Sequence, residues 1–136
     1  MNHPLSALKE VDCVEILTLI DNYTDALLED TEVATRLSDH IGEEISTDTL
    51  VAEHGLSLLV TVQRGKEKRT LLFDTGHTQI GLIHNMEILE INPDDIEAIV
   101  LSHAHMDHTG SLYPLLDKMS RSQRSIAEYL HHQNKH

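Results

Sequence analysis

Positive charge is scarce in this sequence. Its 136 residues include 10 lysines and arginines against 23 aspartates and glutamates, which gives a formal net charge of −13. Nucleic acids and anionic membranes bind proteins through clustered positive charge, so this balance argues against either as a partner. The balance is compatible with a soluble protein whose copies repel one another.

Cysteine and long apolar segments are scarce as well. Cys13 is the single cysteine, which excludes an intrachain disulfide framework. Its place before a run of valine, isoleucine and leucine predicts a buried, unreactive thiol. No apolar run approaches the roughly 20 residues of a membrane-spanning helix, and Met1–Glu10 lacks the apolar region of a secretory signal. A cytoplasmic location is the resulting expectation.

A chain of this length forms one domain at most, with room for a hydrophobic core. Apolar periodicity and turn residues predict strands at residues 15–20, 57–62, 70–73 and 97–101, with a charged hairpin turn at 64–69. Helical segments are predicted at residues 79–91, 93–96 and 110–119, and an irregular loop at 36–49. This order favours an α/β (α+β) fold, a mixed sheet with helices on one face.

The C-terminal residues differ from the rest in composition. Ser120–Ser125 reads Ser-Arg-Ser-Gln-Arg-Ser, and the chain ends on histidine, asparagine and lysine. We therefore divide the chain into residues 1–119, which carry the predicted elements, and residues 120–136, an atypical polar tail.

Four potential metal ligands follow the strand predicted at 97–101: His103, His105, Asp107 and His108. In extended backbone His103 and His105 point to the same side, because side chains alternate along a strand. A turn after Met106 brings Asp107 and His108 toward the same space. Imidazole and carboxylate ligands suit zinc, iron and manganese. The pattern favours a metal site over the alternative, a solvated polar loop.

This stretch resembles a known family. Ser102–Gly110 matches the His-x-His-x-Asp-His motif of the metallo-β-lactamase fold superfamily, and Leu72–Gly76 resembles the Asp-Thr-Gly turn that precedes it. Leu19–Asp25 and Ala52–Leu59 resemble one branch more closely, the 7,8-dihydropterin-6-methyl-4-(β-D-ribofuranosyl)aminobenzene-5'-phosphate synthase-like branch. The resemblance covers about Val14–Leu116. It implies the αββα fold, of which this chain has the N-terminal half only.

The resemblance also implies roles for the motif residues. The first two histidines, here His103 and His105, would bind one metal, and Asp107 and His108 a second. Zinc is expected, two ions per complete site, with iron or manganese as alternatives, and further ligands come from the second half of the fold. Asp107 is also the expected catalytic residue, orienting the attacking hydroxide. Independently of the resemblance, Asp74 lies at the end of a predicted strand and is expected to hydrogen-bond a ligand histidine; capping of its own turn is the open alternative.

Three functions remain open from the sequence. The first is a metal-dependent hydrolase-like protein, truncated and incomplete alone, acting on an ester or phosphoester with metal-activated water. Its partner would be a small-molecule substrate, phosphorylated in the related branch. The second is a non-catalytic metal-binding remnant or subunit whose exposed apolar sheet face needs a complementing chain or a homo-oligomer. The third is a metal buffer, suggested by the 11 histidines. His54 is expected at the surface, with a place at the substrate opening as the alternative.

Overall fold

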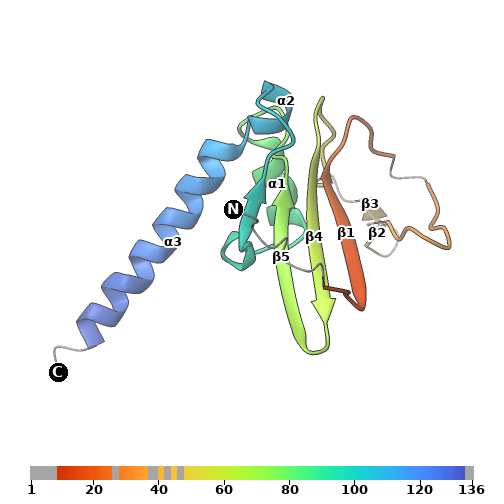
Figure 1. The fold of residues 1–136 in the computed structure, drawn as a ribbon. Coiled ribbons are helices and arrows are strands. Elements are labelled where there is room, and N and C mark those ends of the chain that lie inside the picture. The colour runs from red at the N-terminus through yellow and green to blue at the C-terminus, as the bar shows by residue number, and fades with distance from the viewer. Residues whose placement is uncertain (1–8, 26–27, 37–39, 42–43, 46–47, 134–136) are drawn as a thin grey trace, which may run out of the picture.

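The computed structural model describes residues 9–25, 28–36, 40–41, 44–45 and 48–133. Its main sheet has four strands in the order β1-β4-β5-β6 (Figure 1). The strands are β1 (Cys13–Ile20), β4 (Ser57–Arg64), β5 (Glu67–Phe73) and β6 (Ala98–Val100). The first three are antiparallel, and β6 runs parallel to β5. The predicted mixed sheet is confirmed, and each predicted strand matches one of these four.

The hairpin between β4 and β5 is tighter than predicted. Arg64 pairs directly with Glu67, so the turn consists of Gly65 and Lys66 alone. Gly65 has φ +59, a backbone angle that glycine adopts without steric cost and that short hairpin turns require. Arg64 and Glu67, which carry opposite charges, face each other at the end of the ladder, a pairing that favours strand structure up to the turn.

A second, small sheet lies in the stretch predicted to be irregular. It consists of β2 (His40–Ile41) and β3 (Glu44–Ile45), which pair antiparallel. The polar composition of residues 36–49 gives no strand signal, because two-residue strands are too short for an alternating pattern.

The helical elements of the described residues are α1 (Gly81–Ile88), η1 (Pro93–Asp95), α2 (Met106–Thr109) and α3 (Leu112–Gln133). Helix α1 and the first turns of α3 pack against one face of the main sheet. Leu82 and Met86 of α1 and Leu115 of α3 pack with Leu72 of β5 in the buried core. No helix among the described residues has both the length and the apolar character needed to cross a membrane.

A bulge in β1 contributes two residues to this core. The pairing register between β1 and β4 shifts between Thr18 and Ile20. Side chains on a regular strand alternate between faces, and a bulge breaks that alternation. Leu19 and Ile20 are both buried, at 2% and 1% exposure. The end of β1 is thereby anchored next to the loop that begins at Asp21.

Helix α1 is shorter than the predicted 79–91. Ile80, inside the predicted span, is the N-cap residue and is 74% exposed. Leu82 and Met86 are buried, and Ile83 and Leu89 pack against the same core. The N-cap residue Ile80 makes no side-chain cap hydrogen bond, but Thr78 Oγ1 accepts a hydrogen bond from the Gly81 backbone N–H at 3.0 Å at the start of the helix.

Helix α3 does not end at Met119, where the sequence pattern ended, but continues to Gln133. The helical spacing of its apolar residues stops near Met119, although the polar residues that follow also permit a helix. Figure 1 shows its C-terminal part extending away from the sheet. The division at residue 119 therefore coincides with no end of an element, and two separate parts remain a prediction.

The face of the sheet opposite the helices carries apolar side chains. Val14 and Ile16 of β1 are 50% and 60% exposed, and Val100 of β6 is 41% exposed. The pairing register places Val60 of β4 and Leu71 of β5 on the same face. Cys13, expected to be buried, is exposed. That expectation was wrong because β1 is an edge strand, and its first residues extend beyond the covering helices.

Candidate metal centre

The candidate site forms where β5 and β6 end. Because these two strands are parallel, their carboxyl ends meet at one edge of the sheet. Asp74 follows β5 directly, and its backbone N–H donates to the Val100 carbonyl at 2.8 Å. The predicted ligands follow β6 from His103 onward. Two segments about 30 residues apart are thereby brought side by side.

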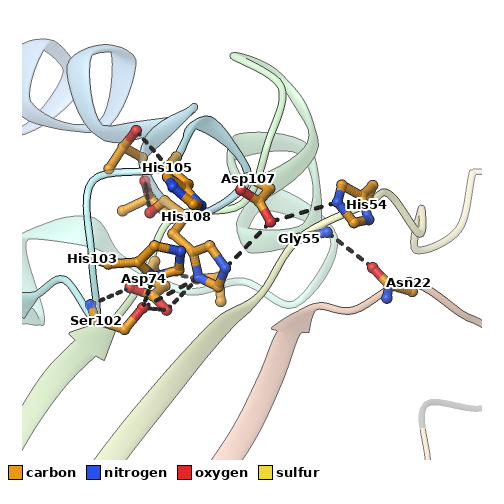
Figure 2. A network of polar contacts seen from close by, with 12 residues as sticks. Asn22, His54, Gly55, Asp74, Ser102, His103, His105, Asp107 and His108 are labelled. Atoms are coloured by element: carbon orange, nitrogen blue, oxygen red, sulfur yellow. Dashed lines mark hydrogen bonds and ion pairs between the residues drawn. The ribbon is translucent and has the colours of Figure 1, made fainter.

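Three of the four predicted ligands form one compact group. One ligand atom from each of His103, Asp107 and His108 lies within 4.8 Å of the other two. The Nε2 atom of His108 is 3.3 Å from Asp107 Oδ2, and the rings of His103 and His108 lie 4.2 Å apart between centroids. Figure 2 shows the three side chains converging from the loop and from α2. Two imidazoles and a carboxylate form a donor set that fits zinc, iron or manganese.

Asp74 holds His108 in a defined orientation. Its Oδ2 accepts a hydrogen bond from His108 Nδ1 at 2.7 Å, and its side chain is fully buried. The Ser102 backbone N–H donates to Asp74 Oδ1, also at 2.7 Å. Burial raises the pKa of the Asp74 carboxyl, but the hydrogen bonds from Ser102 and His108 outweigh it and lower that pKa overall. An ionised Asp74 keeps the proton of His108 on Nδ1 and leaves Nε2 as the ligand atom.

Ser102 links this carboxylate to the first histidine. Its Oγ lies 2.7 Å from Asp74 Oδ2 and 2.9 Å from His103 Nδ1. A hydroxyl that donates to Asp74 accepts from the Nδ1–H of His103. His103, like His108, then presents Nε2 as its ligand atom. Sequence reasoning gave Ser102 no role; the one available signal was a hydroxyl directly before the motif.

His105 lies beside the group of three but outside it. Its ring packs edge-on against His103, with 4.5 Å between centroids. It occupies the N-cap position of α2, and its carbonyl accepts the His108 backbone N–H at 3.1 Å. The metal-binding role that the resemblance implies for His105 therefore stays a prediction, as does the catalytic role of Asp107.

Backbone contacts at two glycines fasten the loops around the site. A Cβ on Gly55 would lie 2.4 Å from the Asp107 carbonyl oxygen, and one on Gly110 would lie 1.8 Å from the carbonyl oxygen of His77. The carbonyl of Asp107 accepts the Leu56 N–H at 3.3 Å. These approaches require residues without a side chain, so three loops meet at distances that only glycine permits.

Glu53 is a structural residue that sequence reasoning missed. Its Oε1 accepts the backbone N–H groups of His77 and Thr78 at 2.8 and 3.0 Å, and its Oε2 accepts the Thr78 hydroxyl at 2.5 Å. The carboxylate occupies space above Gly76 and Gly81, where a Cβ would lie 2.6 Å from it. The signal available in the sequence was a pair of glycines, Gly76 and Gly81. They flank a turn whose backbone N–H groups need an acceptor from elsewhere in the chain.

Replacing Glu53 with alanine is expected to destabilise the fold by about 1–2 kcal/mol, because three donors at the start of α1 lose their acceptor. Urea unfolding followed by circular dichroism measures the change. Glu53→Gln keeps one carbonyl oxygen and is the matched control, with a loss of less than half that size. Equal stability of Glu53→Ala and the unmodified chain would contradict this role.

A hollow of about 220 Å³ adjoins the group of three. Its lining consists of Asp21, Asn22, His54, Gly55, Leu56, Asp107 and His108. The Nε2 atom of His54 is 3.5 Å from Asp107 Oδ2, which places His54 at this opening while its side chain remains 75% exposed. A larger hollow of about 690 Å³ lies along β1 and the segments around Tyr23 and Thr49, and it includes none of the three ligands.

The part of the chain that carries this site also matches a known protein family. Residues 51–135 match the family model of the metallo-β-lactamase superfamily. A 7,8-dihydropterin-6-methyl-4-(β-D-ribofuranosyl)-aminobenzene-5'-phosphate synthase from Methanocaldococcus jannaschii is 40% identical over 70 residues, which cover 52% of this chain and 24% of that protein. The chain thus matches about a quarter of the length of that relative.

A solved structure, the MIM-2 metallo-β-lactamase, shares 26% identity over 49% of this chain and 25% of its own, with a TM-score of 0.39. The family match covers well over half of the chain, including the group of three and the turn at Asp74. On that match, this chain belongs to the metallo-β-lactamase superfamily.

Proposed function

We propose that this chain provides the metal-binding part of a metal-dependent hydrolase that cleaves an ester or phosphoester in a small molecule. The observation that supports this most directly is the convergence of His103, Asp107 and His108 within 4.8 Å. Asp74 and Ser102 support it further, since both histidines have their Nδ1 engaged and present Nε2. A purely structural polar loop would not need both imidazoles held in this way.

Zinc is the metal we propose, because two imidazoles and one carboxylate are a common ligand set of catalytic zinc. Iron and manganese accept the same donors. When bound, such an ion lowers the pKa of a coordinated water and polarises the bond to be cleaved. Two ions per complete site remain part of the proposal, with His105 as a ligand of the pair.

Asp107 is the residue we propose to orient the attacking hydroxide. Its side chain is 26% exposed and borders the hollow, so it lies between the ligand group and the space for substrate. Burial raises the pKa of Asp107, but hydrogen bonding to its own backbone and the nearby His108, His54 and His103 lower that pKa overall. An ionised Asp107 accepts a hydrogen bond from the O–H group of water or hydroxide, and it also attracts a cation.

For the substrate we propose a phosphorylated pterin-type molecule. The support is the name of the archaeal relative, which describes the synthesis of a phosphorylated compound that contains a dihydropterin. The chain matches about a quarter of that protein, and the activity of a complete protein is therefore part of the proposal.

The test combines metal content with turnover in one sample. The purified chain is loaded with zinc, and bound metal is counted by elemental analysis. Hydrolysis of bis(p-nitrophenyl) phosphate and p-nitrophenyl acetate is then followed before and after chelation. We expect retained zinc and hydrolysis that stops on chelation and returns with zinc. The double variant His103→Gln/His108→Gln should lose both properties, while the control His77→Gln should keep them. A chain that retains no metal contradicts the proposal.

A second function is favoured by the exposed sheet face: a metal-binding subunit that is inactive alone. Val14 and Ile16 are at least half exposed on a face that carries apolar side chains from all four strands. Exposed apolar surface of this kind favours association with another chain. Retained zinc without hydrolysis supports this second function. The mass in solution then shows whether a second copy covers the face.

A further inference from the structure

Helix α3 continues past the core against which it packs. Leu115 lies in that core, and Met119 packs against it. Among the side chains that the structure describes, Ser122 is the last on α3 to bond another element, through Asp94 of η1. The backbone stays helical to Gln133 and runs away from the sheet (Figure 1). The final turns of α3 therefore lie beyond the core of their own copy.

The sequence of these final turns continues the apolar stripe of the helix. Ile126 and Leu130 follow Met119 by intervals close to two and three turns of about 3.6 residues each. Tyr129 borders the same stripe, because residues three and four apart are neighbours on a helix surface. Apolar anchors at such spacings are what a helix presents to a groove on another protein.

The tail of residues 120–136 also differs from the rest of the chain in charge. It contains Arg121, Arg124 and Lys135 against Glu128, a formal charge of +2 in a chain of −13. The end of α3 is therefore basic as well as apolar. The surface that complements it is apolar and acidic.

The larger hollow, of about 690 Å³ along β1, has both properties. Its lining includes the carboxylates of Glu15, Asp21 and Asp25 against the guanidinium of Arg36. It also includes apolar and aromatic side chains that are at least 38% exposed: Leu17, Tyr23, Leu28, Val33 and Val51. Exposed apolar surface rimmed by polar groups is typical of a site where another molecule binds.

The hollow has the size of a short piece of helix. A helix about 10–12 Å across occupies roughly 400–600 Å³ per turn of about 5.4 Å. A volume of about 690 Å³ thus accepts between about one and two turns. The segment Ile126–Leu130 spans about 1.4 turns, so the apolar part of the helix end matches the space.

The end of α3 and the hollow lie too far apart to meet within one copy. Figure 1 shows α3 leaving one side of the main sheet, whereas β1, along which the hollow runs, lies at the other side. We propose that the C-terminal end of α3 in one copy docks in the hollow along β1 of a second copy. The apolar stripe then meets the exposed apolar lining, and the basic residues lie near Glu15, Asp21 and Asp25. The contact is head-to-tail, since each copy donates one helix end and accepts another. It involves neither the metal ligands nor the exposed sheet face.

Sedimentation velocity of the full, untagged chain at increasing concentration tests this contact. We expect association in the micromolar range, because the interface is small, and weaker association in salt, because the charges are opposite. The tail variant Ile126→Asp/Leu130→Asp and the hollow variant Leu28→Arg/Val33→Arg should each weaken it at least tenfold. Each brings a charge of the same sign as the surface it meets. The control Ile80→Asp, at an exposed apolar side chain outside both surfaces, should leave it unchanged.

Mixing the two variants separates this contact from misfolding. The hollow variant retains the helix end, and the tail variant retains the hollow. An equimolar mixture should therefore form a dimer and no larger species, because one functional contact remains between the two variants. Each measurement is repeated with EDTA, which prevents metal ions from bridging the histidines of the tail.

The inference is overturned by a full chain that stays monomeric at millimolar concentration, or by a mixture of the two variants that stays monomeric. It is overturned equally by association that either variant retains in full, which belongs to another surface such as the exposed sheet face. Association that EDTA abolishes belongs to metal bridging and overturns it as well.

Discussion

Replacing Asp74 with alanine is expected to weaken zinc binding 10–100-fold and to destabilise the fold by about 3 kcal/mol. The carboxylate is fully buried and accepts hydrogen bonds from the Ser102 N–H, the Ser102 hydroxyl and His108 Nδ1. Without it, His108 loses the contact that fixes its ring, and buried donors lose their acceptor. Competition with a chromophoric zinc chelator measures the affinity, and urea unfolding measures the stability.

Asp74→Asn is the matched control for this prediction. It keeps an oxygen for the Ser102 N–H but removes the charge, so we expect stability to fall less than in the alanine variant while zinc affinity falls nearly as far. Equal zinc affinity in the unmodified chain and in both variants would show that the contact with His108 does not support metal binding.

The same carboxylate predicts a pH dependence in the metal-free chain. Its pKa is lowered in the folded state, so the folded form favours the ionised carboxylate more than the unfolded form does. The resulting stability is present above the unfolded pKa, about 3.9, and is lost as the pH falls through the lowered folded value. Between about pH 6 and about pH 3, the urea concentration at the unfolding midpoint should fall more steeply for the unmodified chain than for Asp74→Asn.

Replacing Gly110 with alanine is expected to cost about 3 kcal/mol or more. The backbone of Gly110 is helical, with φ −59 and ψ −44, a conformation that alanine prefers. The added Cβ, however, would lie 1.8 Å from the His77 carbonyl oxygen and 2.2 Å from its carbon. Backbone atoms cannot yield as a flexible side chain does, so the clash outweighs the helical preference. Thermal or urea unfolding of the purified variant measures the loss.

Gly65→Ala is the control that separates steric from conformational effects. Gly65 has φ +59 and no heavy atom within 4 Å of an added Cβ, so its cost comes from the backbone angle alone, about 1–2 kcal/mol. If Gly110→Ala proves no less stable than Gly65→Ala, the close approach of the loops does not limit stability.

The sequence predicted the elements that have a local pattern. The strands around Ile16, Val60, Leu72 and Val100 were predicted within a few residues because their apolar runs are short and bounded by turn residues. The strand before His103 placed the ligands at a sheet end, which the structure shows. Asp74 was expected near a ligand histidine because it, too, follows a strand; its contact with His108 measures 2.7 Å.

The sequence could not predict contacts that join distant segments. Glu53 lies 24 residues before His77, and Asn85 lies 66 residues after Leu19, whose carbonyl accepts a hydrogen bond from the Asn85 side chain at 2.6 Å. Neither residue belongs to a motif, and their partners are backbone groups that a sequence does not distinguish. The exposure of Cys13 depended in the same way on strand order, which no local pattern contains.

The close backbone approaches at Gly55 and Gly110 affect how a metal ion would bind. Because backbone hydrogen bonds such as Thr75 N–H to the His108 carbonyl, at 2.8 Å, already hold the loop, the ligands need little ordering. Little conformational entropy then opposes binding. The calorimetric signature should be a small heat-capacity change, without the large one that coupled folding produces. Zinc would bind to a preorganised site, and the chain would stay folded when the zinc dissociates.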